Sequence, residues 1–252
     1  SLCAGCPHRG FFYALRKQKD VIITGDIGCY TLGSAAPLSA MDTCFCMGGS
    51  ISAGHGAAMA LKKGGSKLRA VAVIGDSTFF HSGITSLMDA VYNKGNSVSV
   101  ILDNRITGMT GHQENPGTGL TLMGEPTHEV DIPMLCKAIG VKEDNIYTVN
   151  PLDLTETENA LKDALSKDEP TVIIAKWPCV LKKFSDKDKS EFDLTPKRCE
   201  IVQEKCKLCK ACVKTGCPAI TSGDRITINP DSCTGCSICR QVCPFDAIQE
   251  VK

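Results

Sequence analysis

Two cysteine runs in the last quarter of the chain constrain its fold more than any other feature. Each run places three cysteines two residues apart and ends in a Cys-Pro pair. In four-iron, four-sulfur (4Fe-4S) modules, three thiolates of one run bind one cluster, and the Cys-Pro cysteine binds the other. Structural zinc and a disulfide framework are the alternatives, but zinc usually pairs two Cys-x-x-Cys arms. The pattern therefore predicts a small ferredoxin-like α+β module of the bacterial two-cluster type.

The same rule divides the eight cysteines between the two clusters. The first run has four residues, rather than three, before its Cys-Pro pair, so one loop is expected to depart from the usual geometry. We assign the module to residues 199–252. The predicted ligands are Cys206, Cys209, Cys212 and Cys243 for one cluster, and Cys233, Cys236, Cys239 and Cys217 for the other.

Charge and composition argue against several classes of partner. The chain carries 28 basic and 28 acidic side chains, so no net field attracts nucleic acid or an anionic membrane. No apolar run approaches the roughly 18 residues of a membrane-spanning helix, and the first residues lack the apolar centre of a signal peptide. Sixteen cysteines, half of them in runs that need reduced thiolates, suit a reducing and oxygen-poor compartment. We expect a cytoplasmic protein.

The first 180 residues have the pattern of a doubly wound α/β domain. Short apolar runs, DVIITG, LRAVAVIG, SVSVILDN and PTVIIAK, predict buried parallel strands. Between them, SISAGHGAAMALKK, SGITSLMDAVYNKG and LTETENALKDALSK have the apolar spacing of helices. Residues 181–198 are rich in charge and are predicted to be an exposed linker. Sheets of this kind bind ligands beyond the carboxyl ends of their strands.

Two predicted strands end in polar residues that suit a magnesium diphosphate site. Gly75-Asp76-Ser77 follows one strand, and Asp103-Asn104 ends another. Carboxylate, amide and carbonyl oxygens are typical Mg²⁺ ligands, and helix amino ends favour phosphate. Gly-Asp alone is weak evidence, because it closes many strands as a plain turn. The asparagine on a second strand of the same sheet strengthens the prediction.

Together with these strand ends, several motifs resemble the thiamine-diphosphate-binding module of 2-oxoacid:ferredoxin oxidoreductases. Ser77 stands at the third position of the family's GDG motif. The motifs that carry the resemblance are CAGCPHR from Cys3, GDIGC from Gly25, CMGG from Cys46 and NRITGMTGHQ from Asn104. With the attached two-cluster module, the chain resembles the large subunit of the indolepyruvate ferredoxin oxidoreductase family.

The resemblance implies a set of cofactor and site residues. Magnesium would bind Asp76, the Asn104 side chain and the Ile106 carbonyl. Met109 would support the bent cofactor, although simple core filling is the alternative. His8 and His112 are candidate catalytic residues, although structural hydrogen bonds would explain both as well. The implied thiamine-diphosphate contacts are Gly28, Cys29, Cys46, Met47, Gly48, Gly49, Ser77, Gly108 and Met109.

The resemblance also implies a third 4Fe-4S cluster next to thiamine. Its ligands would be Cys3 and Cys6, which form one Cys-x-x-Cys arm, together with Cys29 and Cys179. The alternative is that the arm binds nothing and the two single cysteines are small buried residues, as free cysteine often is.

The implied reaction is the oxidative decarboxylation of a 2-oxoacid, with arylpyruvates such as indolepyruvate favoured, to an acyl-CoA. The implied partners are the substrate, coenzyme A, ferredoxin, and a further subunit or domain that supplies the pyrimidine-binding half, hence a hetero-oligomer. Two other functions remain possible from the residues. A non-oxidative thiamine-dependent decarboxylase would have no use for the cysteine runs. An electron-transfer subunit with a vestigial thiamine fold would not need Asp76 and Asn104.

Overall fold

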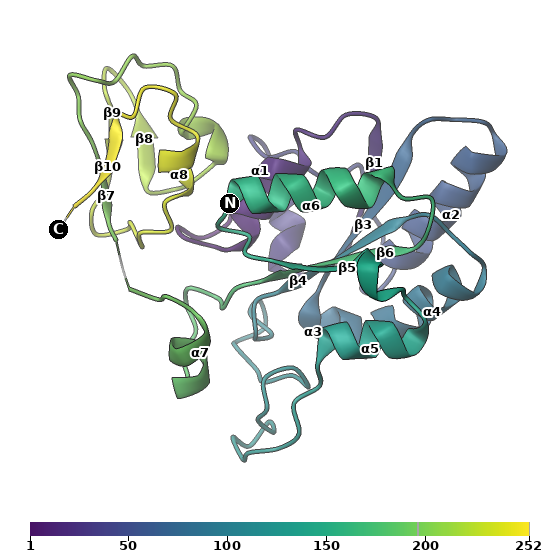
Figure 1. Ribbon diagram of the computed structural model, residues 1–252. Helices are drawn as coiled ribbons and strands as arrows, with labels where there is room; N and C mark the ends of the chain where they lie inside the picture. The colour runs from purple at the N-terminus through teal and green to yellow at the C-terminus, as the bar shows by residue number, and fades with distance from the viewer. Residues whose placement is uncertain (196, 252) are drawn as a thin grey trace.

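A computed structural model describes residues 1–195 and 197–251, and its larger part is built on one parallel sheet (Figure 1). The strand order is β2-β1-β3-β4-β6-β5. Because the chain leaves β1 in one direction to β2 and in the other to β3, the order reverses between β1 and β3. The strands are β1 Val21–Gly25, β2 Thr43–Cys44, β3 Arg69–Gly75, β4 Val98–Asp103, β5 Ile146–Val149 and β6 Thr171–Lys176.

Helices cover both faces of the sheet, so the predicted doubly wound fold is confirmed. In β3, Val71 and Val73 contribute to the core under α1 and α6, whereas Ala72 and Ile74 contribute to the core under α2, α4 and α5. This alternation explains why a buried parallel strand is apolar along its whole length. The helices are α1 His8–Leu15, α2 Ser50–Lys63, α4 Ile84–Tyr92, α5 Ile132–Ile139 and α6 Leu154–Ser166.

The helix predicted for residues 82–95 starts earlier and less regularly than its sequence indicates. A short helical turn, α3 (Asp76–Thr78), directly follows β3 and leads into a π-helical turn, η2 (Phe79–Gly83), before α4 begins. π-Helical turns occur frequently at functional sites. The chain also forms 3₁₀ turns at η1 (Cys29–Ser34) and η3 (Glu143–Asn145).

The cysteine-rich end forms a separate small α+β unit, as predicted. Two antiparallel pairs, β7 with β10 and β8 with β9, enclose a core of isoleucines and cysteines. Its elements are β7 Cys199–Ile201, η4 Val213–Thr215, β8 Ile220–Ser222, β9 Ile226–Ile228, α8 Ile238–Gln241 and β10 Ile248–Glu250.

The segment between the two units is mostly exposed, but it is not an extended tether. It contains α7 (Asp186–Glu191), which begins with a capping box between Ser185 and Asp188. Asp188 is fully buried, and its Oδ2 forms an ion pair with Nζ of Lys182 at 2.9 Å. The proposed limits of the domains and linker stay predictions, and Pro196 and Lys252, which fall within them, lie outside the described residues.

The small unit packs directly against the α/β domain beside α1 and α6 (Figure 1). Arg9 of α1 donates to the Thr215 carbonyl at 3.0 Å. On α8, the Gln241 side chain accepts from the Leu154 amide at 3.0 Å and donates to the Leu152 carbonyl at 2.7 Å. The cysteine module is therefore docked onto the face of the sheet that carries the amino-terminal cysteines.

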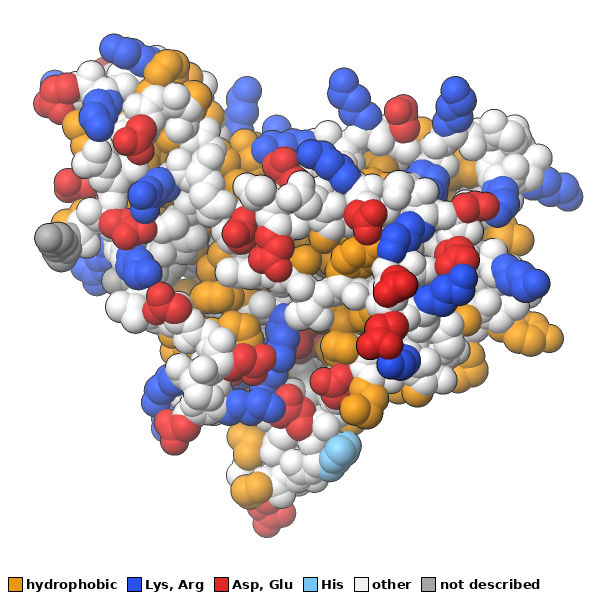
Figure 2. All heavy atoms as spheres, in the orientation of Figure 1, with side chains coloured by type: hydrophobic (Ala, Val, Ile, Leu, Met, Phe, Trp, Pro, Cys, Tyr) orange, Lys and Arg blue, Asp and Glu red, His pale blue; other side chains and the backbone are white. Residues whose placement is uncertain are grey.

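The surface carries no single-sign patch on the face shown in Figure 2, where acidic and basic side chains are interspersed. This agrees with the balance of 28 basic and 28 acidic residues. Among residues 1–195 and 197–251, none of the helices has the length and hydrophobicity needed to cross a bilayer.

Candidate thiamine diphosphate site and cysteine clusters

A cavity of about 260 Å³ opens at the carboxyl ends of β1, β3 and β4. This is the edge where the strand order reverses, and the crevice at such a point is the usual ligand site of open α/β sheets. Many residues singled out from the sequence line it: His8, Gly28, Cys29, Met47, Asp76, Ser77, Asn104, Ile106, Gly108 and Met109.

Three oxygen-bearing groups meet at one side of this cavity. One terminal atom of the Asn104 side-chain amide lies 2.6 Å from the Ile106 carbonyl oxygen and 3.2 Å from Oδ1 of Asp76. With the amide oxygen in that position, three acceptors converge without a donor, which is the donor set that Mg²⁺ prefers. Without a cation, the amide nitrogen can take the position and donate to both oxygens. The three residues predicted as magnesium ligands therefore fit the ion.

Buried polar groups surround Asp76 and hold its carboxylate in place. Its Oδ2 accepts from Nδ2 of Asn115 at 3.0 Å. Burial, and then the nearby charge of Asp103, raise the pKa of Asp76 well above its ordinary value. A divalent cation would offset this cost by favouring the ionised form. Asn115 was not predicted, because it lies in an irregular stretch with no periodic pattern.

A second buried carboxylate, Asp26, organises the glycine-rich loop before α2. Its Oδ1 accepts from the Gly48 amide at 2.8 Å, and its Oδ2 accepts from the Ser50 amide at 2.9 Å. Ser50 is the first residue of α2, whose first N–H groups have no partner within the helix, and Gly48 lies in the loop just before it. Asp26 therefore fixes the CMGG loop against the end of β1.

Glycine is required in this loop and beside it. Gly48 has φ +85°, and a Cβ there would overlap the Ser82 side chain, with Oγ at 2.0 Å. A Cβ on Gly28 or Gly75 would lie 2.4 or 2.5 Å from Cε1 of Tyr30. The Tyr30 ring thus fills the space that side chains would need, and it forms part of the cavity wall.

Some predicted contact residues lie near the cavity without lining it. Cys46, Gly48 and Gly49 belong to the loop before α2 and do not line the cavity. His112 lies outside the lining, with its Nε2 3.9 Å from Sγ of Cys179. By contrast His81, which the sequence did not single out, lines the cavity from η2.

His8 and Ser77 have well-defined surroundings. His8 is buried, packs edge-on against Tyr30, and its pKa is lowered to about 4 by burial, so its imidazole is neutral at pH 7. Ser77 accepts a hydrogen bond from the Thr107 hydroxyl at 2.8 Å, which ties α3 to the loop after β4.

The four cysteines proposed for the third cluster converge beside this cavity. Cys29 lines it, and the Cys179 amide donates to the Asn104 carbonyl at 2.9 Å. Burial raises the pKa of Cys6 to about 12, and the neighbouring Cys179 and Cys3 thiols add to the rise. Burial and the same two thiols raise the pKa of Cys29. Binding of iron would therefore have to displace protons from these thiols.

The structure brings together several of the cysteines assigned to each cluster of the small unit. Cys206, Cys209, Cys212 and Cys243 surround one small cavity. In the other group, burial raises the pKa of Cys236 to about 11, and the neighbouring Cys217 and Cys233 thiols add to it. The Cys199 amide donates to Sγ of Cys233 at 3.5 Å. Hydrogen bonds to cluster sulfurs raise reduction potentials.

A buried ion network supports the loop after β4. Arg105 has φ 57° and is 3% exposed. Its Nε lies 3.2 Å from Oδ1 of Asp188. Lys182 pairs with the same carboxylate and donates to the Arg105 carbonyl at 3.2 Å. The segment after Cys179 thus holds the residue between Asn104 and Ile106.

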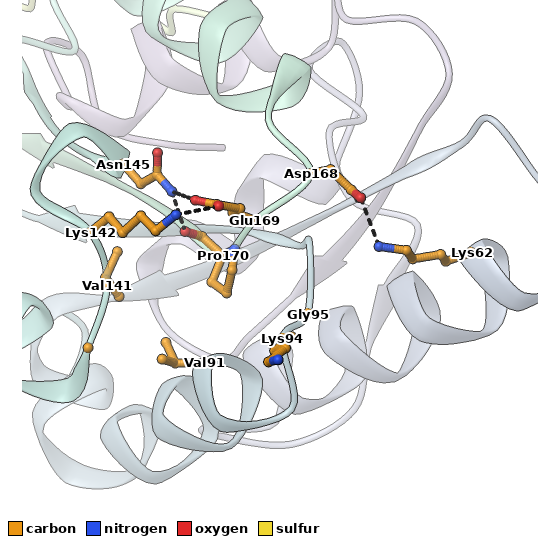
Figure 3. A pocket seen from close by; sticks show the side chains of 11 residues that line it. Lys62, Val91, Lys94, Gly95, Val141, Lys142, Asn145, Asp168, Glu169 and Pro170 are labelled. Carbon is orange, nitrogen blue, oxygen red and sulfur yellow. Dashed lines mark hydrogen bonds and ion pairs between the residues drawn. The ribbon is translucent and has the colours of Figure 1, made fainter.

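A larger cavity of about 450 Å³ lies at the opposite, amino-terminal end of the strands (Figure 3). Four of its charged side chains form two pairs, Lys62 with Asp168 and Lys142 with Glu169, and Lys94 also lines it. Asn145 donates to Glu169 at 3.0 Å. Because both carboxylates of this cavity are already paired with lysines, we take the smaller cavity, with its converging oxygen groups, as the candidate functional site.

Comparison with known families identifies the family of the domain that contains the cavity. The family model "Thiamine pyrophosphate enzyme, C-terminal TPP binding domain" matches residues 26–175. The chain belongs to this family of thiamine pyrophosphate enzymes. The matched range begins directly after β1 and includes the ends of β3 and β4, where the cavity opens. A 4Fe-4S binding domain model matches residues 226–249, which include the second cysteine run.

Curated relatives confirm the resemblance found in the motifs. The indolepyruvate oxidoreductase subunit IorA of Pyrococcus abyssi is 42% identical over 270 residues, covering 100% of this chain and 40% of that protein. Its namesake from Methanothermobacter thermautotrophicus is 40% identical, covering 99% of this chain and 40% of that protein. The chain thus spans about 40% of the length of these relatives.

Solved structures share the fold at lower identity. A 2-oxoglutarate:ferredoxin oxidoreductase from Magnetococcus marinus superposes with a TM-score of 0.62 at 16% identity, covering 76% of this chain and 69% of that one. A benzoylformate decarboxylase from Polynucleobacter necessarius gives a TM-score of 0.51 at 20% identity, covering 70% and 34%. At these identities the likeness concerns the fold alone.

Proposed function

We propose that this chain is the thiamine-diphosphate and electron-transfer part of a 2-oxoacid:ferredoxin oxidoreductase of the indolepyruvate type. The reaction would convert a 2-oxoacid, coenzyme A and two oxidised ferredoxins into acyl-CoA, carbon dioxide, a proton and two reduced ferredoxins. One observation carries the proposal: an eight-cysteine module is docked against a thiamine-type domain in the same chain. A non-oxidative decarboxylase would have no use for that module. The names of the relatives favour an arylpyruvate substrate.

The chain's own residues would bind and orient the cofactor. Asp76, Asn104 and the Ile106 carbonyl would hold Mg²⁺, with Asn115 fixing the carboxylate. The diphosphate would lie at the start of α3, which lines the cavity, because helix amino ends favour anions. Thiamine diphosphate, once bound, supplies carbanion stabilisation for decarboxylation. The apolar side chains of Met47, Met109 and Ile106 would exclude water there.

Electron removal would begin at the third cysteine group. Cys29 belongs to both the cavity and this group, so a cluster on Cys3, Cys6, Cys29 and Cys179 would border the cofactor. We propose this cluster, with the two of the small unit, as the route from thiamine to ferredoxin. His8 is proposed as a neutral hydrogen-bonding group at the cavity, because burial disfavours its charged form. For His112, whose ring approaches Cys179, we propose a place beside that cluster.

Activity is expected to require a further subunit or domain. In the thiamine enzymes that the chain resembles, a glutamate on a pyrimidine-binding domain activates the cofactor. The chain spans only 40% of the length of its relatives. We therefore expect no measurable 2-oxoacid decarboxylation by the anaerobically purified 252-residue chain with thiamine diphosphate, Mg²⁺ and coenzyme A.

Adding the remaining part of the protein, as a separate polypeptide or by fusion, should restore 2-oxoacid-dependent ferredoxin reduction. The rate is measured with indolepyruvate, phenylpyruvate and 2-oxoglutarate. Preference for an aryl substrate supports the indolepyruvate type. Substantial turnover by the 252 residues alone would contradict this account of cofactor activation.

A further inference from the structure

Arg9 is a buried cation without an acidic partner. Only 1% of its surface is exposed. Its guanidinium donates only to neutral carbonyls: Nη1 to Thr215 at 3.0 Å, and Nη2 to Leu2 at 2.6 Å and Cys3 at 2.8 Å. Its Nε has no hydrogen-bond partner. Within residues 1–195 and 197–251, Arg9 forms no ion pair; the arginines that do are Arg105 and Arg240.

A buried charge in this situation calls for a negative group nearby. Removing an ionised side chain from water costs several kcal/mol in real proteins, and buried charges are normally paired. Carbonyl dipoles offset only part of that cost. The guanidinium of Arg9 therefore needs a counter-charge that is neither aspartate nor glutamate.

Two cysteine groups flank the guanidinium. On one side it contacts the Cys3 carbonyl, and on the other it contacts Thr215, two residues before Cys217. A Cβ on Gly216 would lie 3.3 Å from its Nη1. One buried cation thus lies next to both cysteine groups.

The two groups themselves are in contact. A Cβ on Gly5, between Cys3 and Cys6, would overlap Oγ1 of Thr234 at 1.8 Å. Thr234 lies between Cys233 and Cys236. The amino-terminal cysteine turn therefore packs directly on the second cysteine run, with Arg9 beside the contact.

We propose that Arg9 is a positioning residue for electron transfer, whose charge balances the anionic clusters on either side and raises their reduction potentials. These are the clusters proposed on Cys3, Cys6, Cys29 and Cys179 and on Cys217, Cys233, Cys236 and Cys239. A cluster bound by four thiolates gains a further negative charge on reduction, so a neighbouring cation stabilises the reduced state. The inference rests on the proposed function for the first of these clusters.

The test is a redox titration of the anaerobically purified chain, followed by electron paramagnetic resonance. Arg9→Gln should lower the reduction potential of both clusters by about 59 mV or more. This corresponds to a tenfold or larger change in the equilibrium constant of one-electron reduction. Arg9→Lys keeps the charge and should leave both potentials near those of the unchanged chain. Arg16→Gln is the matched control, because Arg16 also bridges α1 to the small unit, through the Lys214 carbonyl at 3.4 Å, but from an exposed position. It should shift neither potential.

Loaded clusters with unchanged potentials in Arg9→Gln would overturn the proposal, and so would equal shifts in Arg9→Gln and Arg9→Lys. If Arg9→Gln fails to load iron, Arg9→Lys decides. Normal iron and potentials in that variant support a role of charge, and their loss shows a role of hydrogen-bond geometry instead. Should the unchanged chain hold only the two clusters of the small unit, the third-cluster proposal fails, but the potential of the Cys236 cluster still tests Arg9.

Discussion

Cys179→Ala is expected to lower the iron content of the anaerobically purified chain from about twelve to about eight atoms, because one of the three proposed four-iron clusters would lose a ligand. Cys179 follows β6, donates its amide to the Asn104 carbonyl and lies near the Cys3, Cys6 and Cys29 thiols. The two clusters of the small unit should remain, because their eight cysteines lie in a separate core. Iron analysis and the visible absorption spectrum measure the loss.

Cys136→Ala is the matched control for this variant. Cys136 of α5 is fully buried in the core on the other face of the sheet, so the variant should retain all of the iron. About eight iron atoms in both the unchanged chain and Cys179→Ala, with identical spectra, would show that the four cysteines are structural. The electron path would then run straight to the small unit.

Asp76→Ala is expected to weaken thiamine diphosphate binding in the presence of Mg²⁺ by more than about 100-fold, or roughly 2.7 kcal/mol. The substitution removes the only carboxylate among the three oxygen-bearing groups that meet in the cavity. It also deletes a buried carboxyl group whose ionisation is disfavoured by burial, so the fold should be retained. Calorimetric titration with thiamine diphosphate measures the affinity.

Asp186→Ala provides the comparison for Asp76→Ala. Asp186 is an exposed carboxylate at the start of α7, so its loss should change neither thiamine affinity nor iron content. In Asp76→Ala the cluster absorbance should equal that of the unchanged chain. Undiminished thiamine binding by Asp76→Ala would remove the assignment of this cavity.

The parts of the fold that the sequence predicted are those with strong local patterns. The strands β1, β3, β4 and β6 lie within one residue of the predicted runs, because parallel strands that are buried on both faces are continuously apolar. Asp76 and Asn104 could be placed together because the carboxyl ends of neighbouring parallel strands meet at one edge. By contrast β2, with two residues, has too little sequence to form a pattern.

Features that depend on distant contacts could not be predicted. Asn115 reaches Asp76 from an irregular loop, and nothing in its neighbourhood marks it as buried. Asp188 lies in a stretch whose high charge indicated an exposed linker. Its buried partner Arg105 follows β4 and is far from it in the sequence. The docking of the small unit rests on contacts such as that from Arg9 to Thr215, which are 206 residues apart. Such pairings arise only when the chain has folded.

The measurement that most directly tests the central claim is the cofactor content of the unaltered chain, purified without oxygen and reconstituted with iron, sulfide, thiamine diphosphate and Mg²⁺. The account predicts about one thiamine diphosphate and about twelve iron atoms per chain, retained together through gel filtration. Iron without thiamine diphosphate would contradict it, because the α/β domain would then be a support for electron carriers. Thiamine diphosphate without iron would contradict it equally, because the site would then serve a non-oxidative reaction.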